Sequence, residues 1–229
     1  MSNESGRRIA AEEAPSKPWE SVFRDLQGGI IAGAYRPRER LIEDEIIART
    51  GATRHAVRRS FDELERLGLV VRQPNRGVQV RDYTLAEIEE LYEIRTCLET
   101  QAALRFAMPA APEVIERLAD LAARHEQASR AQRFAEVFDL NNVFHETLYG
   151  AAGNRLLAKA ILQYTFSTHL IRTRAFPSEE MREIAIADHF AMIEAIRRGD
   201  NASLAAIIRS HIQRPKDFYV RATFISPGL

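Results

Sequence analysis

Two arginines four residues apart are the first residues in this chain whose spacing could do chemistry. Arg54 and Arg58 fall within residues 53–59, and in a helix both guanidinium groups would leave the same exposed face. A guanidinium presents a planar fork of donors that fits a phosphate or a guanine edge. Taken alone, the pair is better explained as an ordinary solvated helix with basic residues, so the neighbouring elements must decide.

Three histidines form a second group with the types and spacing of a metal site. His145, His189 and His211 each lie on the apolar stripe of a separate predicted helix. A single inward histidine is usually a hydrogen-bonded core residue, but three buried imidazoles each need partners for two nitrogens. One shared cation would satisfy all three. The pattern therefore predicts a divalent metal site, with Zn²⁺ favoured and Ni²⁺ or another first-row ion as alternatives.

Asn141 is the fourth candidate ligand, because it lies four residues before His145 and on the same side of that helix. Its amide oxygen is neutral and a weaker ligand than a carboxylate. The other histidines are predicted to matter less. We expect His125, in a polar run, at the surface. His55, next to Arg54, either lies free at the surface or touches the same partner as the arginines, and His169 is expected to pack in the core rather than to line a pocket.

Arg95 is the candidate receptor for an anion. It shares a helical stripe with Leu91, Tyr92 and Leu98, where an unpaired charge is costly. Glu99, one turn further on, could neutralise it internally. Alternatively, Arg95 receives the carboxylate of a small organic acid that also reaches the metal. The sequence leaves both alternatives open and does not select an acid.

The elements around Arg54 and Arg58 predict a winged helix-turn-helix. An amphipathic segment over 41–50 precedes a turn at Gly51, and Thr53 can cap the helix that follows. Gly68 suits the left-handed position that ends this helix. Two short strands, 69–72 and 76–80, are expected to flank a turn at 74–75. This order of elements places one helix in the DNA major groove.

From residue 84 onward the periodicity is helical throughout. We expect helices near 84–107, 112–130, 133–150, 154–174, 179–198 and 201–214. The connections are short, so neighbouring helices should pack antiparallel in a bundle. The predicted organisation is a disordered tail over 1–18, a winged helix-turn-helix over 19–81, and an all-helical domain over 82–229 that holds effector and metal and forms the dimer.

The first of these domains resembles the N-terminal domain of GntR-family transcription regulators. The resemblance rests on residues 30–33, 37–41 and 53–58 and on the wing pair Arg76-Gly77. Arg38 departs from it, because glycine is usual there. The DNA contacts that the resemblance implies are Arg40, Thr53, Arg54, Arg58, Arg76 and Gly77. Base reading would fall mainly to Arg54 or Arg58, with Arg40 and Thr53 on phosphates.

The helical domain resembles the FCD domain, the ligand-binding bundle of the FadR subfamily of that family. The matching residues are Arg95 and Glu99, the run 141–145, the run 152–154, His189 and His211. The resemblance implies a regulator with a C-terminal site for metal and a small acid, and it covers roughly residues 19–214.

Composition agrees with this interpretation. The net charge is zero, but residues 18–81 carry +3 and residues 82–229 carry −3, so the DNA-facing part is mildly basic. The single Cys97 forms no internal disulfide and fits a reducing cytoplasm. No apolar segment is long enough to span a bilayer, and no signal peptide is evident.

The sequence thus predicts a cytoplasmic homodimeric repressor that binds a roughly palindromic operator and responds to a small organic acid bound beside a metal. We do not expect an enzyme. Two alternatives stay open at this point: a dedicated metal sensor without an organic effector, and an all-α metalloenzyme fused to a DNA-binding domain. A metal that only supports the fold is the simplest interpretation of the histidines.

Overall fold

The N-terminal part of the protein is a winged helix-turn-helix. The computed structural model describes residues 17–73 and 77–225. The elements are α1 (Pro18–Ile31), β1 (Arg40–Leu41), α2 (Glu43–Thr50), α3 (Arg54–Arg66), β2 (Val70–Gln73) and β3 (Gly77–Val80). The predicted turn at 74–75 and most of the predicted tail lie outside the described residues. Pro18, assigned to that tail, is the first residue of α1.

Local chemistry explains where α3 begins and ends. The Thr53 hydroxyl accepts a hydrogen bond from the Ala56 N–H at 3.2 Å, which confirms the predicted cap. Gly68 follows the helix with a φ of +68°, the left-handed conformation that glycine adopts without strain. Arg38, which stands where the resembling family has glycine, also has a positive φ of 66°. The turn geometry is therefore kept despite the substitution.

The wing is a three-stranded antiparallel sheet with the order β1-β3-β2. β3 pairs with β2 in the predicted hairpin, and also with β1, a short strand that the sequence did not predict. Arg40 lies opposite Gln79 in this sheet. The extra pairing fixes the segment before α2, and therefore Arg40, against the wing.

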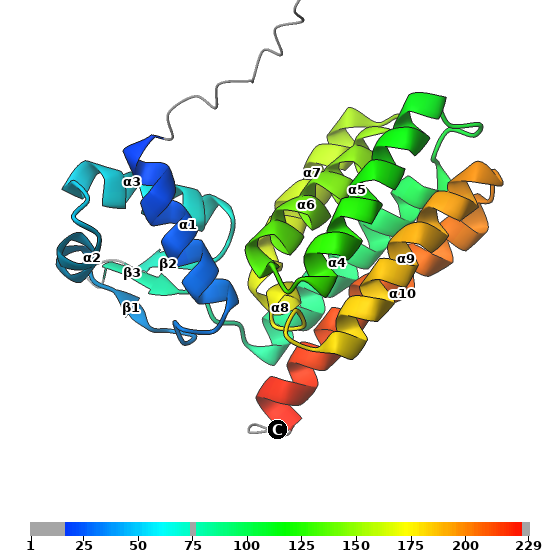
Figure 1. Ribbon diagram of the computed structural model, residues 1–229. Helices are drawn as coiled ribbons and strands as arrows, with labels where there is room; N and C mark the ends of the chain where they lie inside the picture. Colours follow the sequence, from blue (N-terminus) through cyan, green and yellow to red (C-terminus); the bar gives the residue numbers. More distant parts are fainter. Residues whose placement is uncertain (1–16, 74–76, 226–229) are drawn as a thin grey trace, which may run out of the picture.

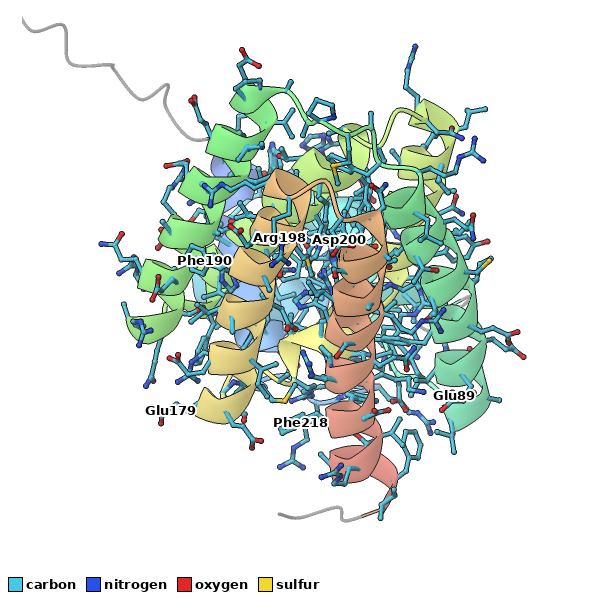
Figure 2. All side chains as sticks on the ribbon, turned by 90° about the vertical axis from the view of Figure 1, so that its right-hand side faces the viewer. Glu89, Glu179, Phe190, Arg198, Asp200 and Phe218 are labelled. Atoms are coloured by element: carbon cyan, nitrogen blue, oxygen red, sulfur yellow. The ribbon has the colours of Figure 1, made fainter. Side chains whose placement is uncertain are left out.

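The rest of the chain is an antiparallel helical bundle (Figure 1). Its elements are α4 (Leu85–Leu104), α5 (Pro112–Arg130), α6 (Phe134–Gly150), α7 (Arg155–Ser167), α8 (His169–Thr173), α9 (Glu179–Arg197) and α10 (Asn201–Val220), followed by a π-helical turn at Arg221–Ile225. Figure 2 shows α9 and α10 side by side, with α5 beside α9 and α4 beside α10, which agrees with the contacts between these helices. No helix in the described residues is both long and apolar enough to cross a membrane.

Two of the predicted helix boundaries are wrong. The single helix expected over 154–174 is broken at Thr168, because the Thr168 hydroxyl bonds to the Thr165 carbonyl and accepts from Arg95 on another helix. The last helix does not stop at 214 but continues through Pro215 to Val220. Its final turn buries Tyr219, so tertiary packing outweighs the hydrogen bond that proline removes.

Two apolar clusters hold the molecule together. One lies within the helical bundle. The other is shared by both parts of the chain: it includes Leu64 and Leu69 of the winged helix and Tyr92, Leu170 and Tyr219 of the bundle. The winged helix is therefore packed against the bundle, on the side where α6, α7 and α8 lie in Figure 1.

Candidate metal centre and DNA-reading surface

Three histidines from three helices converge inside the bundle, as their periodicity predicted. His145 comes from α6, His189 from α9 and His211 from α10, and one ring nitrogen of each lies within 4.8 Å of the others. The Nε2 atoms of His145 and His211 are 3.2 Å apart. Two nitrogens bound to one tetrahedral Zn²⁺ would be about 3.4 Å apart, given Zn–N bonds of about 2.0–2.1 Å. The arrangement thus has the dimensions of a metal site.

Burial keeps two of these imidazoles neutral. It lowers the pKa of both His145 and His189 well below the usual value, and nearby cationic groups lower it further. Within the described residues, His145 Nδ1 and both ring nitrogens of His189 have no hydrogen-bond partner. Neutral buried imidazoles with free nitrogens are the form that binds a metal, so the donor set fits a divalent ion.

Asp188 orients the third imidazole and was missed by the sequence analysis. Its carboxylate lies 3.1 Å from His211 Nδ1, and a carboxylate can only accept, so His211 donates there. In the neutral ring this leaves the Nε2 lone pair facing His145. Asp188 is itself bonded by Arg214. Little in the sequence pointed to Asp188, because a charged residue beside an apolar stripe usually faces solvent.

The prediction for His125 was wrong. It is buried on α5, and its ring centroid lies 4.6 Å from that of His189. Burial lowers its pKa to about 4. The polar neighbours in sequence point elsewhere on the helix, whereas Leu121 and Ala122 share its face. Helical periodicity, rather than local polarity, was the signal that could have placed it.

A cavity of about 640 Å³, its open mouth included, lies next to the histidines. Asn141 borders it together with His145 and His211, and is 8% exposed. The position of Asn141 is compatible with the predicted ligand role, which stays a prediction.

Arg95 borders the same cavity but is neutralised internally, which is one of the two alternatives that the sequence left open. Its Nε donates to Glu99 at 2.8 Å and its Nη1 to the Thr168 hydroxyl at 3.0 Å. Tyr149 donates to the other oxygen of Glu99 at 2.5 Å. The pair thus belongs to a buried network that joins α4, α6 and the break between α7 and α8.

Arg172 on α8 is one of two buried arginines of the cavity wall, with Arg182, that form no ion pair with a carboxylate of the described residues, and sequence reasoning missed it. It is 9% exposed and donates to Asn142 at 2.8 Å, while its Nε has no partner. No carboxylate in the described residues forms an ion pair with it. Burial, with Arg95 nearby, lowers its pKa to about 10, so it is still charged at neutral pH. A buried guanidinium without an acidic partner has the charge and donors to receive an anion.

The predicted DNA contacts meet on one face of the winged helix. Arg40, Arg58 and Gly77 border one shallow hollow. Glu43 also borders this hollow and forms an ion pair with Arg54. The side chains of Arg54 and Arg58 are 56% and 61% exposed. Thr53 is engaged in capping α3. Arg76 lies outside the described residues.

Comparisons with known proteins follow the same division of the chain. The model of bacterial regulatory proteins of the gntR family matches residues 18–80, and the FCD domain model matches residues 90–214. The HTH-type transcriptional repressor RspR of Escherichia coli K12 is 23% identical over 200 residues, covering 87% of this chain and 88% of the relative. An uncharacterized HTH-type regulator of Bacillus subtilis, YdhC, is 24% identical over 203 residues, with 87% and 89% covered.

Solved structures show the same fold. A putative transcriptional regulator GntR from Rhodococcus sp. RHA1 superposes with a TM-score of 0.68 at 21% identity, covering 90% of this chain and 99% of that one. E. coli McbR/YncC gives 0.65 at 20% identity, with 90% and 100% covered. These likenesses confirm the predicted winged helix followed by an all-helical bundle.

Proposed function

This chain belongs to the GntR family of bacterial regulatory proteins and carries an FCD domain, so it is a DNA-binding transcription regulator and not an enzyme; on this premise we propose that it is a homodimeric repressor controlled by a small carboxylate bound beside a divalent metal. Residues 19–81 would bind the operator and residues 82–229 would hold the ligands and the dimer contact. A relative named as a repressor supports the sign of regulation.

The metal would be held by His145, His189 and His211, with Asn141 as a fourth ligand. Zn²⁺ suits three imidazoles, although Ni²⁺ or another first-row ion has the same donors. A bound ion supplies a positive centre that attracts a carboxylate oxygen. Asp188 fixes the ring of His211, and burial keeps His145 and His189 neutral, so this chain's own residues prepare the site for a cation.

The single observation that carries the effector proposal is the unneutralised guanidinium of Arg172 at the cavity wall. A small acid would place one carboxylate against Arg172, while Arg95 stays bound to Glu99 and supports the wall. This revises the role of Arg95, which the sequence nominated as the receptor itself. Any acid that binds here would remove the cost of a buried unpaired charge.

The cavity is connected to the winged helix-turn-helix through residues 166–168. Arg95 bonds to Thr168 from the cavity side. From the other side, the Tyr83 hydroxyl donates to the Ser167 carbonyl, and Gly68 lies against the Phe166 carbonyl. Gly68 directly follows the end of α3. A ligand that shifts α8 can therefore change how α3 is held, provided that it binds the two arrangements unequally.

The effector proposal is tested by thermal shift of the zinc-loaded protein with acetate, lactate and succinate, each beside its neutral amide. We expect at least one acid, and no amide, to raise the melting temperature, and Arg172→Gln to abolish that shift while the metal content is unchanged. An acid-specific shift that survives in Arg172→Gln contradicts the proposed receptor. A response of DNA affinity to metal alone, with no response to acids, would favour a dedicated metal sensor.

DNA binding through the proposed contacts is tested separately by Arg54→Ala. The protein should bind a duplex selected from its own promoter region in a salt-dependent way, and this variant should weaken that binding. Unchanged affinity would remove Arg54 from the reading surface.

A further inference from the structure

The two arginines of the recognition helix are held by acidic side chains of the preceding helix. Glu43 Oε1 lies 3.2 Å from Arg54 Nη1 and 3.0 Å from Arg58 Nε, and Glu43 Oε2 lies 3.2 Å from the same Nε. Asp44 bonds to Arg54 Nη2 at 2.7 Å. Glu43 is 24% exposed, far less than either arginine. One carboxylate thus bridges both predicted base-reading residues.

The two arginines are held in different ways. Arg58 is bonded only through Nε, so both of its terminal nitrogens make no hydrogen bond with any described residue and can reach DNA. Arg54 has both terminal nitrogens bonded to carboxylates. Glu43 therefore orients the Arg58 guanidinium through Nε and leaves its two terminal nitrogens available for DNA. Arg54, in contrast, must give up a bond to a carboxylate before a terminal nitrogen can bind DNA.

From this geometry we propose that Glu43 is a specificity-determining residue of the regulator, acting by positioning Arg58 and by competing with DNA phosphates for Arg54. Any duplex offers phosphates, but a phosphate that approaches these arginines meets the charge of Glu43 as well. A duplex with a guanine edge opposite Arg58 uses the free end of the fork and leaves the Glu43 bond intact. Glu43 would thus weaken binding to arbitrary sequence more than binding to the operator. The proposal rests on the DNA contacts proposed above.

Glu45 provides a matched control for charge. Like Glu43, it lies in the first turn of α2, where an acidic side chain interacts favourably with the helix dipole. It is exposed and forms no ion pair with a described residue. Removing its charge therefore repeats the long-range effect of removing the charge of Glu43, without releasing an arginine.

The experiment compares Glu43→Gln with Glu45→Gln in the full chain. Fluorescence anisotropy measures binding to a duplex selected by the unmodified protein from a random library, and to a duplex of unselected sequence, at several salt concentrations. Glu43→Gln should bind the unselected duplex about threefold to tenfold more tightly, with a steeper salt dependence. Its discrimination between the duplexes should fall by at least the same factor. Glu45→Gln should change both affinities alike, by less than about twofold.

Equal behaviour of the two variants would overturn the proposal. If Glu43→Gln melts at a lower temperature, Glu43→Asp serves as a second variant, because it keeps the charge but shortens the reach by one methylene. It should lose discrimination without gaining affinity for the unselected duplex, and retained discrimination would again overturn the proposal. Arg58→Ala distinguishes a failure of the Glu43 proposal from a failure of the proposed DNA contacts. If Arg58→Ala leaves DNA binding unchanged, the DNA contacts themselves are misassigned.

Discussion

Replacing Gly68 by alanine should loosen the contact between the winged helix-turn-helix and the helical bundle. Gly68 has a φ of +68°, and a Cβ built on it would lie 2.5 Å from the Phe166 carbonyl oxygen and 3.2 Å from its carbon. Both atoms belong to the backbone of α7, so neither can rotate out of the way. The two segments must separate to admit even one methyl group.

Gly51 supplies the control for the size of this effect. Its φ is also +68°, but a Cβ there would meet nothing within 4 Å. Alanine at Gly51 therefore adds only the cost of a left-handed residue, about 1–2 kcal/mol. Alanine at Gly68 adds the same cost and a steric term of about 1–3 kcal/mol. In a chain of this size, 1 kcal/mol corresponds to about 2–4 °C, so Gly68→Ala should melt at least about 2 °C below Gly51→Ala.

Thermal unfolding followed by circular dichroism measures the difference, and hydrogen exchange locates it. We expect faster exchange around residues 166–168 in Gly68→Ala than in Gly51→Ala, because the opposing backbone is displaced. An acid that shifts the melting temperature should also lose its effect on DNA affinity in Gly68→Ala. Identical melting and exchange in the two variants would refute the argument that this contact joins the two parts of the protein.

Three further predictions concern single sites. His189→Ala should lower the metal content from about one ion per chain to a small fraction, measured by mass spectrometry of protein prepared without chelators, while Cys97→Ala, which changes an exposed side chain, should not. Arg172→Met should raise the unfolding free energy of the ligand-free protein by about 1–3 kcal/mol in a denaturant titration, because it removes a buried charge without an acidic partner; a loss of stability would mean that the charge is compensated. Arg58→Ala should weaken binding to a selected duplex at least about tenfold, and an equal loss on unselected DNA would indicate a phosphate contact instead.

The sequence could predict the parts of this protein that local periodicity determines. The direction in which His145, His189 and His211 point follows from the apolar stripes of their own helices, and that these stripes face one core follows from the short connections. The ends of α3 are similarly local, since Thr53 and Gly68 act on adjacent backbone groups. For these features no knowledge of distant contacts was needed.

What the sequence missed depends on contacts between distant segments. Arg172 was placed in one long helix, and only the bond from Arg95 to Thr168 reveals that the helix breaks and turns Arg172 toward the cavity. Glu43 is an acidic residue at the start of a helix, which is a common position for such a residue. Its hydrogen bond with Arg58 appears only when α2 and α3 are placed together. The role of Asp188 could not be predicted either, because its partner His211 lies on another helix.

We propose above that three histidines hold a metal and that a small acid bridges from this metal toward Arg172. A crystal structure of the protein as purified from cells, with anomalous data collected at metal absorption edges, tests it most directly. We predict one anomalous peak per chain within about 2.0–2.2 Å of a nitrogen of His145, His189 and His211, and density for an acid between this peak and the Arg172 guanidinium. Histidines bonded only to water or to one another, with Arg172 paired to a carboxylate of the protein, would contradict it.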